Sequence, residues 1–509
     1  METAKIDFST PRRQASVAIG IILIKFIRMT IRAIWPILIS FFIGGRNNST
    51  FEEILGYIVI AFGAFNLIGS VLTYFRFYFH LESGAIVIDK GLLKRTHSNI
   101  PFERIQTINF KQNILHQIFN VVSVEIDTAG AKKSEMSIDA LTKADAEALR
   151  SQIMEGKSQL EPTAEPVQQT TAELLEKLEA EEAEKEPILH LNPIDLLKVG
   201  ISQNHLRSMG IIFAFVFTTL SQYDENWTEL VANQAENYES YLPESGILLF
   251  AVTTILVLII SFLFSLINTV LKHFELSLYL QKGGLKVVRG LLNREEISIN
   301  QSKIQIISWS ENPIRRMFRL FTLQIEQASS AEASQLKSKI RIPGCYMEQV
   351  RKVITSTFPE EFFRDEPRHR VSILLKYRLF FFVGVVPAML ATVGLWFTAE
   401  WEALYALLWI PAHWFMVTLY YKKRSFELNE ELLKNNTGIF GNGHDLMQLH
   451  KVQAVKVKQS WYQRRKAIAT VQIFTAAGHL TVPFIPLQLA LELENYLLYR
   501  AESDKREWM

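Results

Sequence analysis

The stretch GLLKRTHSNIPFERIQTINF, which runs from Gly91 to Phe110, returns as GLLNREEISINQSKIQIISW from Gly290 to Trp309. The two align without a gap, 199 residues apart (290 − 91). A third version, GIFGNGHDLMQLHKVQAVKV, runs from Gly438 to Val457, 347 residues after the first (438 − 91). An internal repeat of this length indicates an architecture of repeated units and is considered before any single motif. The chain is therefore predicted to build one unit three times, as copies 1, 2 and 3.

Each copy has the pattern of a small β-rich domain. In copy 1 the runs AIVIDKG, RIQTINF and VVSVEIDTAG are rich in β-branched residues and bounded by Gly, Asn and Asp, which is typical of strands. Between the last two runs, Ile114–Phe119 has helical spacing. Each copy ends in an amphipathic helix, which covers the open end or edge of a small curled sheet. These closing helices are predicted over Leu141–Ile153, Met347–Phe358 and Pro486–Glu502.

A pair of apolar runs precedes each copy. A helix that crosses a bilayer needs ~20 mostly apolar residues, so six spans in three hairpins are predicted. The first member of pairs one and two is short and is expected to recruit residues upstream. The pairs are Ala33–Gly45 with Ile54–Phe75, Met209–Tyr223 with Gly246–Ile267, and Leu379–Phe397 with Leu404–Tyr421.

The distribution of Lys and Arg predicts how the chain crosses the membrane. The loop Ser221–Gly246 has acidic residues but no Lys or Arg, and the turn Thr398–Glu402 also lacks positive charge. The opposite ends of the apolar runs carry Lys and Arg, as in Lys422–Arg424. Because positive charge stays on the cytoplasmic side, both termini and every long polar stretch are predicted to be cytoplasmic.

The repeat and the apolar runs together set the expected domain boundaries. The segment Glu155–Pro187 is acidic and poor in aromatic residues, so it is interpreted as a solvated linker. The expected organisation is a basic lead-in with membrane hairpin 1 at 1–75, domain 1 at 76–155, an acidic linker at 156–188, hairpin 2 at 189–272, domain 2 at 273–358, hairpin 3 at 359–421 and domain 3 at 422–509.

Composition and motifs exclude several classes of function. The 509 residues carry a net charge of only +2, so bulk charge gives no argument for nucleic-acid binding. The single cysteine, Cys345, excludes an intramolecular disulfide, and the sequence has no Cys/His spacing typical of zinc sites. It has no metalloprotease, serine-nucleophile or phosphate-loop motif. The protein is therefore predicted to be non-enzymatic, without catalytic residues, metal or cofactor.

Three glutamines recur at one repeat position. As ligand contacts they would form a functional set, whereas on strands they would satisfy backbone groups of a neighbouring loop. The structural interpretation is favoured. The residues are Gln106, Gln305 and Gln453.

His413 lies in the middle of the sixth predicted span. An ionisable residue at membrane depth marks a functional site by default. A single neutral imidazole can instead hydrogen-bond to another helix, and no other ionisable residue lies near the middle of a span to form a proton relay. The structural interpretation is favoured here too, and the functional one stays open.

Two groups of basic residues are candidates for contact with the membrane surface. Lys25, Arg28 and Arg32 form one stripe on the otherwise apolar segment Val17–Pro36. Each would cost ~2.5–3.5 kcal/mol in the middle of a bilayer, whereas in the interface they attract anionic headgroups. The short helices of copies 2 and 3 are also basic, and copy 1 has Gln117 at the equivalent position. Their cations either form a solvated face or contact the anionic leaflet; they are Arg315, Arg316, Arg319, Arg464, Arg465 and Lys466.

The order of Gly-turn, strand, "IQ" strand, short helix, "TAG" strand and closing helix resembles the bacterial pleckstrin-homology-like (PH-like) family, type 2. The resemblance is carried by Gly91–Gly130, Gly290–Ser329 and Gly438–Gly478, and covers most of the chain. Three such domains, each behind a membrane hairpin, are similar to multi-pass members of that family. Copy 3 departs from the pattern with charged residues where the other short helices have Ile118-Phe119 and Met317-Phe318. The resemblance implies three PH-like barrels but no agreed ligand or catalytic activity.

Two functions remain. The favoured one is a non-enzymatic scaffold or sensor of the bacterial cytoplasmic (inner) membrane, in envelope stress or antimicrobial resistance. Its PH-like domains would bind a protein partner, a second copy of the chain, or anionic lipid headgroups, and no nucleic acid. The alternative is a transporter or lipid-handling protein that works through its six helices. Against transport, the predicted spans carry almost no intramembrane charge.

Overall fold

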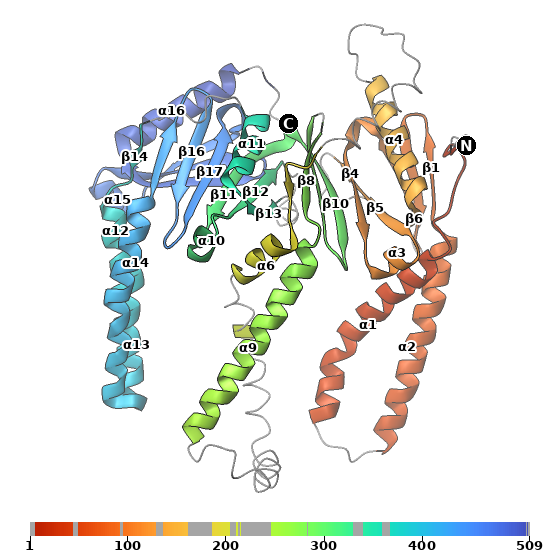
Figure 1. Cartoon of the computed structure of the whole chain (residues 1–509), viewed down its shortest axis with the longest axis horizontal. Helices are drawn as coiled ribbons and strands as arrows, with labels where there is room; N and C mark the ends of the chain where they lie inside the picture. Colours follow the sequence, from red (N-terminus) through yellow and green to blue (C-terminus); the bar gives the residue numbers. More distant parts are fainter. Residues whose placement is uncertain are drawn as a thin grey trace.

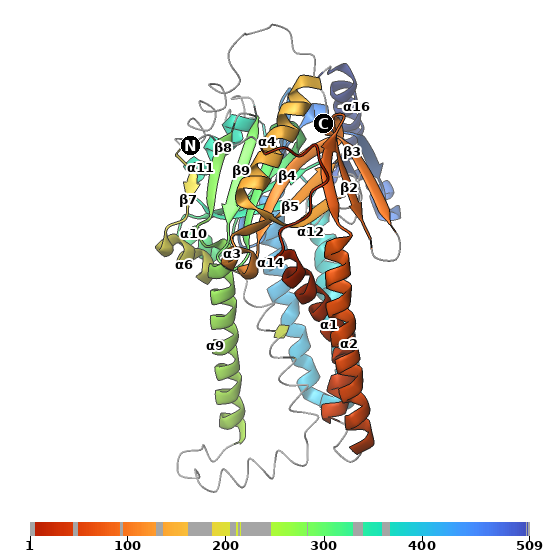
Figure 2. The same ribbon diagram turned by 90° about the vertical axis from the view of Figure 1, so that its right-hand side faces the viewer.

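The computed structural model describes residues 6–43, 49–91, 95–128, 136–160, 186–203, 246–281, 283–328, 339–358 and 367–504, together with residues 210, 211, 214 and 506. Three β-rich bodies lie side by side, and the helices that carry the apolar runs leave all of them on the same side (Figure 1). The view turned by 90° shows the same separation of sheets and helices (Figure 2). In chain order these bodies are copies 1, 2 and 3.

Every copy has the same element order, as the repeat predicts. Three strands precede a 3-10 turn and three follow it, with a short helix after the fourth strand and a long helix at the end. In copy 1 the elements are β1 (Tyr78–Glu82), β2 (Ala85–Lys90), β3 (Thr96–Pro101), η1 (Phe102–Arg104), β4 (Ile105–Gln112), α3 (Ile114–Ile118), β5 (Val121–Thr128), β6 (Met136–Thr142) and α4 (Lys143–Leu160).

Copies 2 and 3 add a two-residue strand at their start. In copy 2 the elements are β7 (Leu189–His190), α6 (Pro193–Ile201), β8 (Ser277–Gln281), β9 (Gly284–Arg289), β10 (Arg294–Asn300), η2 (Gln301–Lys303), β11 (Ile304–Glu311), α10 (Pro313–Met317), β12 (Phe321–Gln327), β13 (Lys339–Cys345) and α11 (Met347–Thr357). In copy 3 they are β14 (His369–Arg370), β15 (Ser425–Leu428), β16 (Leu432–Thr437), β17 (Asn442–Gln448), η7 (Leu449–Lys451), β18 (Ala454–Lys458), α15 (Trp461–Arg465), β19 (Ile468–Thr475), β20 (Gly478–Pro486) and α16 (Leu487–Ser503).

The sheets run across the copies. The second half of copy 1 and the first half of copy 2 form one sheet, in the order β6-β5-β4-β10-β9-β8-β7. Copies 2 and 3 share a second sheet, in the order β13-β12-β11-β17-β16-β15-β14. Three-stranded sheets, β1-β2-β3 and β18-β19-β20, remain at the two ends. We call the β4–β10 junction the first seam and the β11–β17 junction the second seam.

The resemblance implied three PH-like barrels, each closed by a C-terminal helix, whereas none of the described sheets closes on itself. In copies 2 and 3 the third strand pairs with the fourth strand of the preceding copy and not with the fourth strand of its own. Thus β10 pairs with β4, and β17 pairs with β11. Both junctions are antiparallel, so the hydrogen bonds that a closed barrel would make within a copy are made between copies.

Hydrophobic cores follow the same plan. Burial alternates along the strands, as a period of two requires: Val122, Val124 and Ile126 of β5 are buried. The core of copy 2 also contains Leu432 and Leu446 of copy 3. The copies are therefore joined by apolar packing as well as by backbone hydrogen bonds, which makes burial across the seams part of the stability of each copy.

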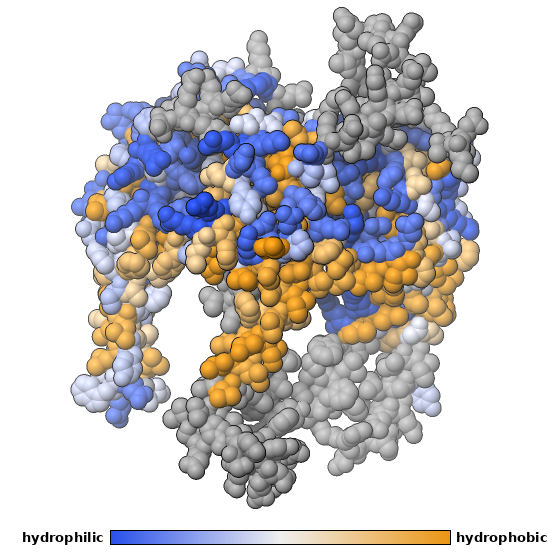
Figure 3. Space-filling view, viewed as in Figure 1, coloured by the Kyte–Doolittle hydropathy of each residue, from blue (hydrophilic) through white to orange (hydrophobic). Residues whose placement is uncertain are grey.

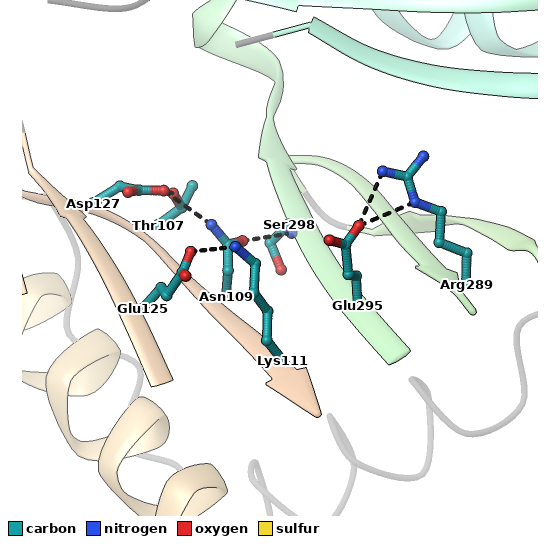
Figure 4. Close-up of polar contacts among 8 residues, drawn as sticks. All are labelled: Thr107, Asn109, Lys111, Glu125, Asp127, Arg289, Glu295 and Ser298. Carbon is teal, nitrogen blue, oxygen red and sulfur yellow. Dashed lines mark hydrogen bonds and ion pairs between the residues drawn. The ribbon is translucent and has the colours of Figure 1, made fainter. Parts of the chain in front are cut away.

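Polar side chains fix the first seam (Figure 4). The Asn109 Nδ2 donates to Asp127 Oδ2 at 2.9 Å, and its Oδ1 accepts from the backbone N–H of Ser298 at 3.2 Å. From α4, Arg150 reaches Glu296 at 3.2 Å and the Ser298 hydroxyl at 3.0 Å. One asparagine thus bonds to both copies, and a closing helix of copy 1 also holds the strand of copy 2.

The long helices carry the apolar runs. The first hairpin consists of α1 (Ala18–Ile43) and α2 (Ser49–Phe75), and the second contains α9 (Gly246–His273). The third is built from α12 (Leu374–Leu379), a π-helix (Phe380–Val385), α13 (Val386–Ala399), a 3-10 segment (Glu400–Leu408) and α14 (Trp409–Lys423).

Three described helices are long and apolar enough to cross a membrane, namely Thr254–His273, Leu374–Thr398 and Glu400–Lys423. They correspond to the fourth, fifth and sixth predicted spans. A shorter apolar stretch, Ala61–Phe75, lies in α2. Most of the third predicted span, Met209–Tyr223, and the loop Ser221–Gly246 lie outside the described residues, as does the linker from 161 to 185. The count of six spans remains a prediction.

Candidate membrane-facing site

The short helices α3, α10 and α15 occupy the same place in the three copies, close to where the long helices leave the sheets (Figure 1). Each begins at a side-chain cap that accepts a backbone N–H, because its first turn has no internal partner. The caps are Asn113, Asn312 and Ser460. Each ends near a residue with positive φ, which reverses the chain into the next strand; these residues are Asn120, Arg319 and Ala467.

Each short helix exposes a large apolar side chain. Ile118 is 68% exposed, Met317 is 79% exposed and Trp461 is 69% exposed. Hydrophobic residues gather over the helices and the adjoining part of the sheets, whereas hydrophilic residues dominate the opposite part (Figure 3). Contiguous exposed apolar surface marks an interaction site. Next to helices of membrane-spanning length, that surface fits the interface of a bilayer.

In copy 2 the three predicted cations separate into two kinds. Arg315 is partly buried, donates from Nε to the Ser202 hydroxyl at 3.3 Å and contacts the Thr322 hydroxyl. Burial lowers the pKa of its guanidinium. Arg316 and Arg319 are exposed. Arg315 therefore ties α10 to α6 and β12, and two cations remain for the surface.

In copy 3 the three predicted cations, Arg464, Arg465 and Lys466, are all exposed. The Arg465 guanidinium lies 3.8 Å from the centre of the Trp461 ring. Such a pair combines an apolar body and a charge at one surface, as residues of the membrane interface do. At the equivalent place in copy 1, Gln117 donates instead to the backbone oxygen of Leu291 at 2.8 Å.

The basic lead-in forms a continuous helix with the first predicted span, because α1 runs unbroken from Ala18 to Ile43. Lys25 pairs with Asp139 of β6, so this cation is held by copy 1. Arg28 and Arg32 are exposed. The predicted stripe thus has one member bound to the sheet and two that face outward along the helix.

His413 stabilises an irregular part of the third hairpin. Its Nε2 lies 3.3 Å from the backbone oxygen of Leu379, just before the π-helix, and its ring packs against Gly384, where a Cβ would come within 2.6 Å. The Trp409 indole N–H donates to the backbone oxygen of Val383 at 3.2 Å. That oxygen lies four residues before Pro387, which has no N–H to offer. Both side chains contact backbone oxygens across the hairpin, and the structural interpretation of His413 remains a prediction.

Gln106 and Gln305 lie at the second residue of the fourth strand, where the strand pairing is irregular, and Gln453 immediately precedes the fourth strand of copy 3. Pairing skips Gln106 in β4 and Gln305 in β11, which places both at β-bulges. Their exposure differs: Gln305 is buried, Gln106 is half-buried and Gln453 is exposed. A β-bulge is a structural feature that copies 1 and 2 share at this position, and the structural interpretation of the three glutamines remains a prediction.

A pocket of about 540 Å³ lies between the third hairpin and α15. This volume is within the range of small-molecule sites. Apolar side chains dominate its wall, and the Arg378 guanidinium lies over the Phe484 ring at 5.3 Å. The lining includes Leu379, Phe382, Trp461 and Phe484. No local pattern in the sequence indicates this pocket, because its walls come from segments some 80 residues apart (461 − 379).

Within the described residues, no group of three or more His, Cys, Asp or Glu side chains is arranged to hold a metal ion. The features of this region are exposed apolar side chains, exposed cations and one described pocket, which are features of a binding surface.

Comparison with known proteins agrees with this arrangement. The family model described as "Bacterial PH domain" matches residues 18–157, 230–357 and 378–501, one region for each copy. The chain is also 25% identical over 473 residues to the UPF0699 transmembrane protein YdbT of Bacillus subtilis (strain 168), an alignment that covers 91% of this chain and 92% of that protein. The resemblance seen in the sequence is therefore confirmed. Since the three matched regions make up most of its length, the chain is a membrane protein that belongs to the bacterial PH domain family.

Proposed function

We propose that this protein is a non-enzymatic scaffold or sensor of the bacterial cytoplasmic membrane. Both termini lie in the cytoplasm, and the three PH-like copies rest on the inner leaflet, where they bind headgroups and present their outer surface to protein partners. The observation that carries the proposal is the exposed apolar side chain on every short helix, at Ile118, Met317 and Trp461, beside the membrane helices.

Charge distinguishes the copies on this surface. Each Lys or Arg near an anionic leaflet contributes ~1 kcal/mol, and the effect decays within a Debye length. The two exposed cations of α10 therefore contribute ~2 kcal/mol, or roughly 30-fold in the contact equilibrium. Copy 3 has three exposed cations at this place. The short helix of copy 1 has no cation at this position, because the equivalent residue is Gln117.

An environment-sensitive fluorophore tests this on the full chain in lipid nanodiscs. Cys345 is replaced by Ala, and the label is placed on Met317→Cys or, as the matched control in copy 1, on Ile118→Cys. We expect the Met317 label to enter a more apolar environment in anionic than in zwitterionic nanodiscs, and high salt or Arg316→Gln with Arg319→Gln to remove the difference. Equal dependence on lipid charge at both labels, or none at Met317, would contradict the proposal.

The pocket supports a second candidate, a lipid-handling role. It lies where the third hairpin meets copy 3, and it offers apolar walls, the cation of Arg378 and the hydroxyl of Ser460. This combination suits a molecule with an acyl chain and an anionic headgroup. It points to binding of single lipid molecules more than to transport of a small solute.

A further inference from the structure

Two sheet edges distinguish the ends of the molecule from its middle. Within the described residues, β3 pairs on one side only, with β2, and β18 pairs on one side only, with β19. Their equivalents in the other copies pair on both sides: β10 and β17 take the place of β3, and β4 and β11 take the place of β18. At one end of the molecule β3 lacks the partner that β10 and β17 have, and at the other end β18 lacks the partner that β4 and β11 have.

Other edges, which recur in all copies, are contacted by neighbouring segments. Near the free side of β6, Ala15 N–H donates to the Ala140 oxygen at 3.0 Å, and near that of β20, Ser372 N–H donates to the Phe484 oxygen at 2.7 Å. The outer edge of β1 exchanges hydrogen bonds with Arg12. Among the strands of the described residues, β3 and β18 are the ones that lack the seam partner which their repeat equivalents have. An exposed strand edge is a template for another strand.

We propose that β18 of one chain pairs with β3 of a second copy of the same chain, as a third seam. We infer a second copy of the chain as the partner because the equivalents of these two strands pair with each other twice within the molecule. The equivalents of β18 and β3 pair as β4 with β10 and as β11 with β17. The contact is head to tail, so it continues the row of copies from one chain to the next.

The two existing seams define the register of the third. The second seam pairs Ile306 with Met447; moving these by the repeat offsets, 148 residues forward (438 − 290) and 347 back, places Ala454 opposite Ile100. The first seam pairs Gln112 with Arg294; moving these 347 forward and 199 back places Gln459 opposite Arg95. Both transfers give one continuous antiparallel register, in which Lys456 faces Ser98 and Lys458 faces Thr96.

The side chains on these edges are compatible with pairing. Edge lysines such as Lys456 and Lys458 often protect a strand from association. In the first seam, however, Lys111 directly opposes Glu295, so charged side chains accompany pairing in this fold. Pro101 has no N–H to donate, but it lies one residue beyond the last pair of the transferred register.

A basic residue at the 3-10 turn adds a second link across the seams. In copy 3, the Lys451 Nζ donates to the backbone oxygens of Ser302 at 2.8 Å and Ile304 at 2.6 Å in the preceding copy. The equivalent Lys303 is 7% exposed at the first seam. In copy 1 the equivalent residue is Arg104, which is exposed. In the proposed contact, Arg104 faces the η7 turn of the other chain, where it can make the bonds that Lys451 makes.

A bilayer accommodates this assembly. The helices that carry the apolar runs leave the three copies on one side (Figures 1 and 2). Repeating the relation between copies therefore keeps the helices of each added chain on that side, and the chains form a row or a closed ring on the membrane surface. Closure depends on the rotation between successive copies.

Disulfide cross-linking in native membranes tests both contact and register. With Cys345 replaced by Ala, each chain carries one cysteine in β3 and one in β18. Residues directly opposite in antiparallel strands have Cβ atoms ~5 Å apart, close to disulfide geometry. Thr96→Cys with Lys458→Cys, and Ser98→Cys with Lys456→Cys, should give a ladder of oligomers on oxidation. Thr96→Cys and Ala454→Cys are four residues out of register, which separates them by ~13 Å along the strand, so this pair should not cross-link.

Chains with different tags and one cysteine each determine the direction. Co-expression of Ser98→Cys with Lys456→Cys should give a dimer that contains both tags, and either variant alone should not cross-link. The proposal is overturned if the in-register pairs give no oligomers, if they cross-link only within one chain, or if the out-of-register pair reacts equally well.

Discussion

Lys303 and Lys451 occupy equivalent positions in the 3-10 turns of copies 2 and 3, one at each seam, and both are buried. Burial lowers the pKa of Lys303 to about 7 and that of Lys451 to about 8. Lys451 has two backbone oxygens as acceptors, which favour its charged form. For Lys303, burial is opposed by the nearby Asp127 carboxylate and reinforced by the charge of Lys157.

This predicts a pH dependence of stability. Between pH 7 and about 10 the unfolded chain binds a proton at Lys303 that the folded chain has released, so the free energy of unfolding rises with pH. The rise is at most about 1.4 kcal/mol per pH unit. Lys303→Met should stabilise the detergent-solubilised chain at pH 7 and lose part of this rise, as measured by denaturant unfolding at pH 7 and pH 9. The exposed Lys352→Met is the control, and equal slopes for Lys303→Met and the wild type would refute the prediction.

The repeat alignment predicted which residues of the short helices are cations. It did not predict where each side chain points. Arg315 was therefore grouped with Arg316 and Arg319, although it bonds to Ser202 and Thr322. Ser202 lies 113 residues before Arg315, and no local pattern indicates that the two are close. Likewise, the sequence placed His413 at membrane depth but not opposite Leu379.

At the scale of elements, the order of strands and short helices followed from β-branched runs and turn residues. The pairing of those strands did not. The run REEISIN of β10 alternates polar and apolar residues, as a solvated edge would, yet its outer edge joins β4. Partner choice between strands nearly 200 residues apart depends on three-dimensional complementarity, which periodicity does not contain. The barrels that the resemblance implied therefore gave no indication of the sheets shared between copies.

The pocket between the third hairpin and α15 gives a prediction about these elements. If it holds a lipid, Leu379→Trp should fill it, and lipid retained by the purified full chain should fall several-fold in native mass spectrometry. Overpacking of this kind also costs ~1–3 kcal/mol of stability. Leu390→Trp places the same side chain at an exposed position of α13 and should retain lipid as the wild type does. Equal retention in the two variants would remove the support for lipid handling.

At the scale of the whole molecule, the seams join three copies into one continuous body, and the helices that carry the apolar runs leave it on one side (Figure 1). Such a body can place three membrane-facing surfaces in fixed register and keep the opposite, hydrophilic face available to partners (Figure 3). A single copy excised from the chain would expose seam strands and part of a shared core. The unit of function is therefore expected to be the full chain.

The central claim is that all three copies lie at the cytoplasmic face of the membrane. The direct measurement is labelling of single cysteines in intact cells with an impermeant thiol reagent, after Cys345→Ala. Ser151→Cys on α4 and Ser503→Cys at the end of α16 are exposed positions in copies 1 and 3, and Ser221→Cys lies in the acidic loop predicted to be outside. We predict labelling at Ser221→Cys alone, with the other two labelled only after the cells are opened. Labelling of either copy in intact cells, with Ser221→Cys protected, would contradict the account.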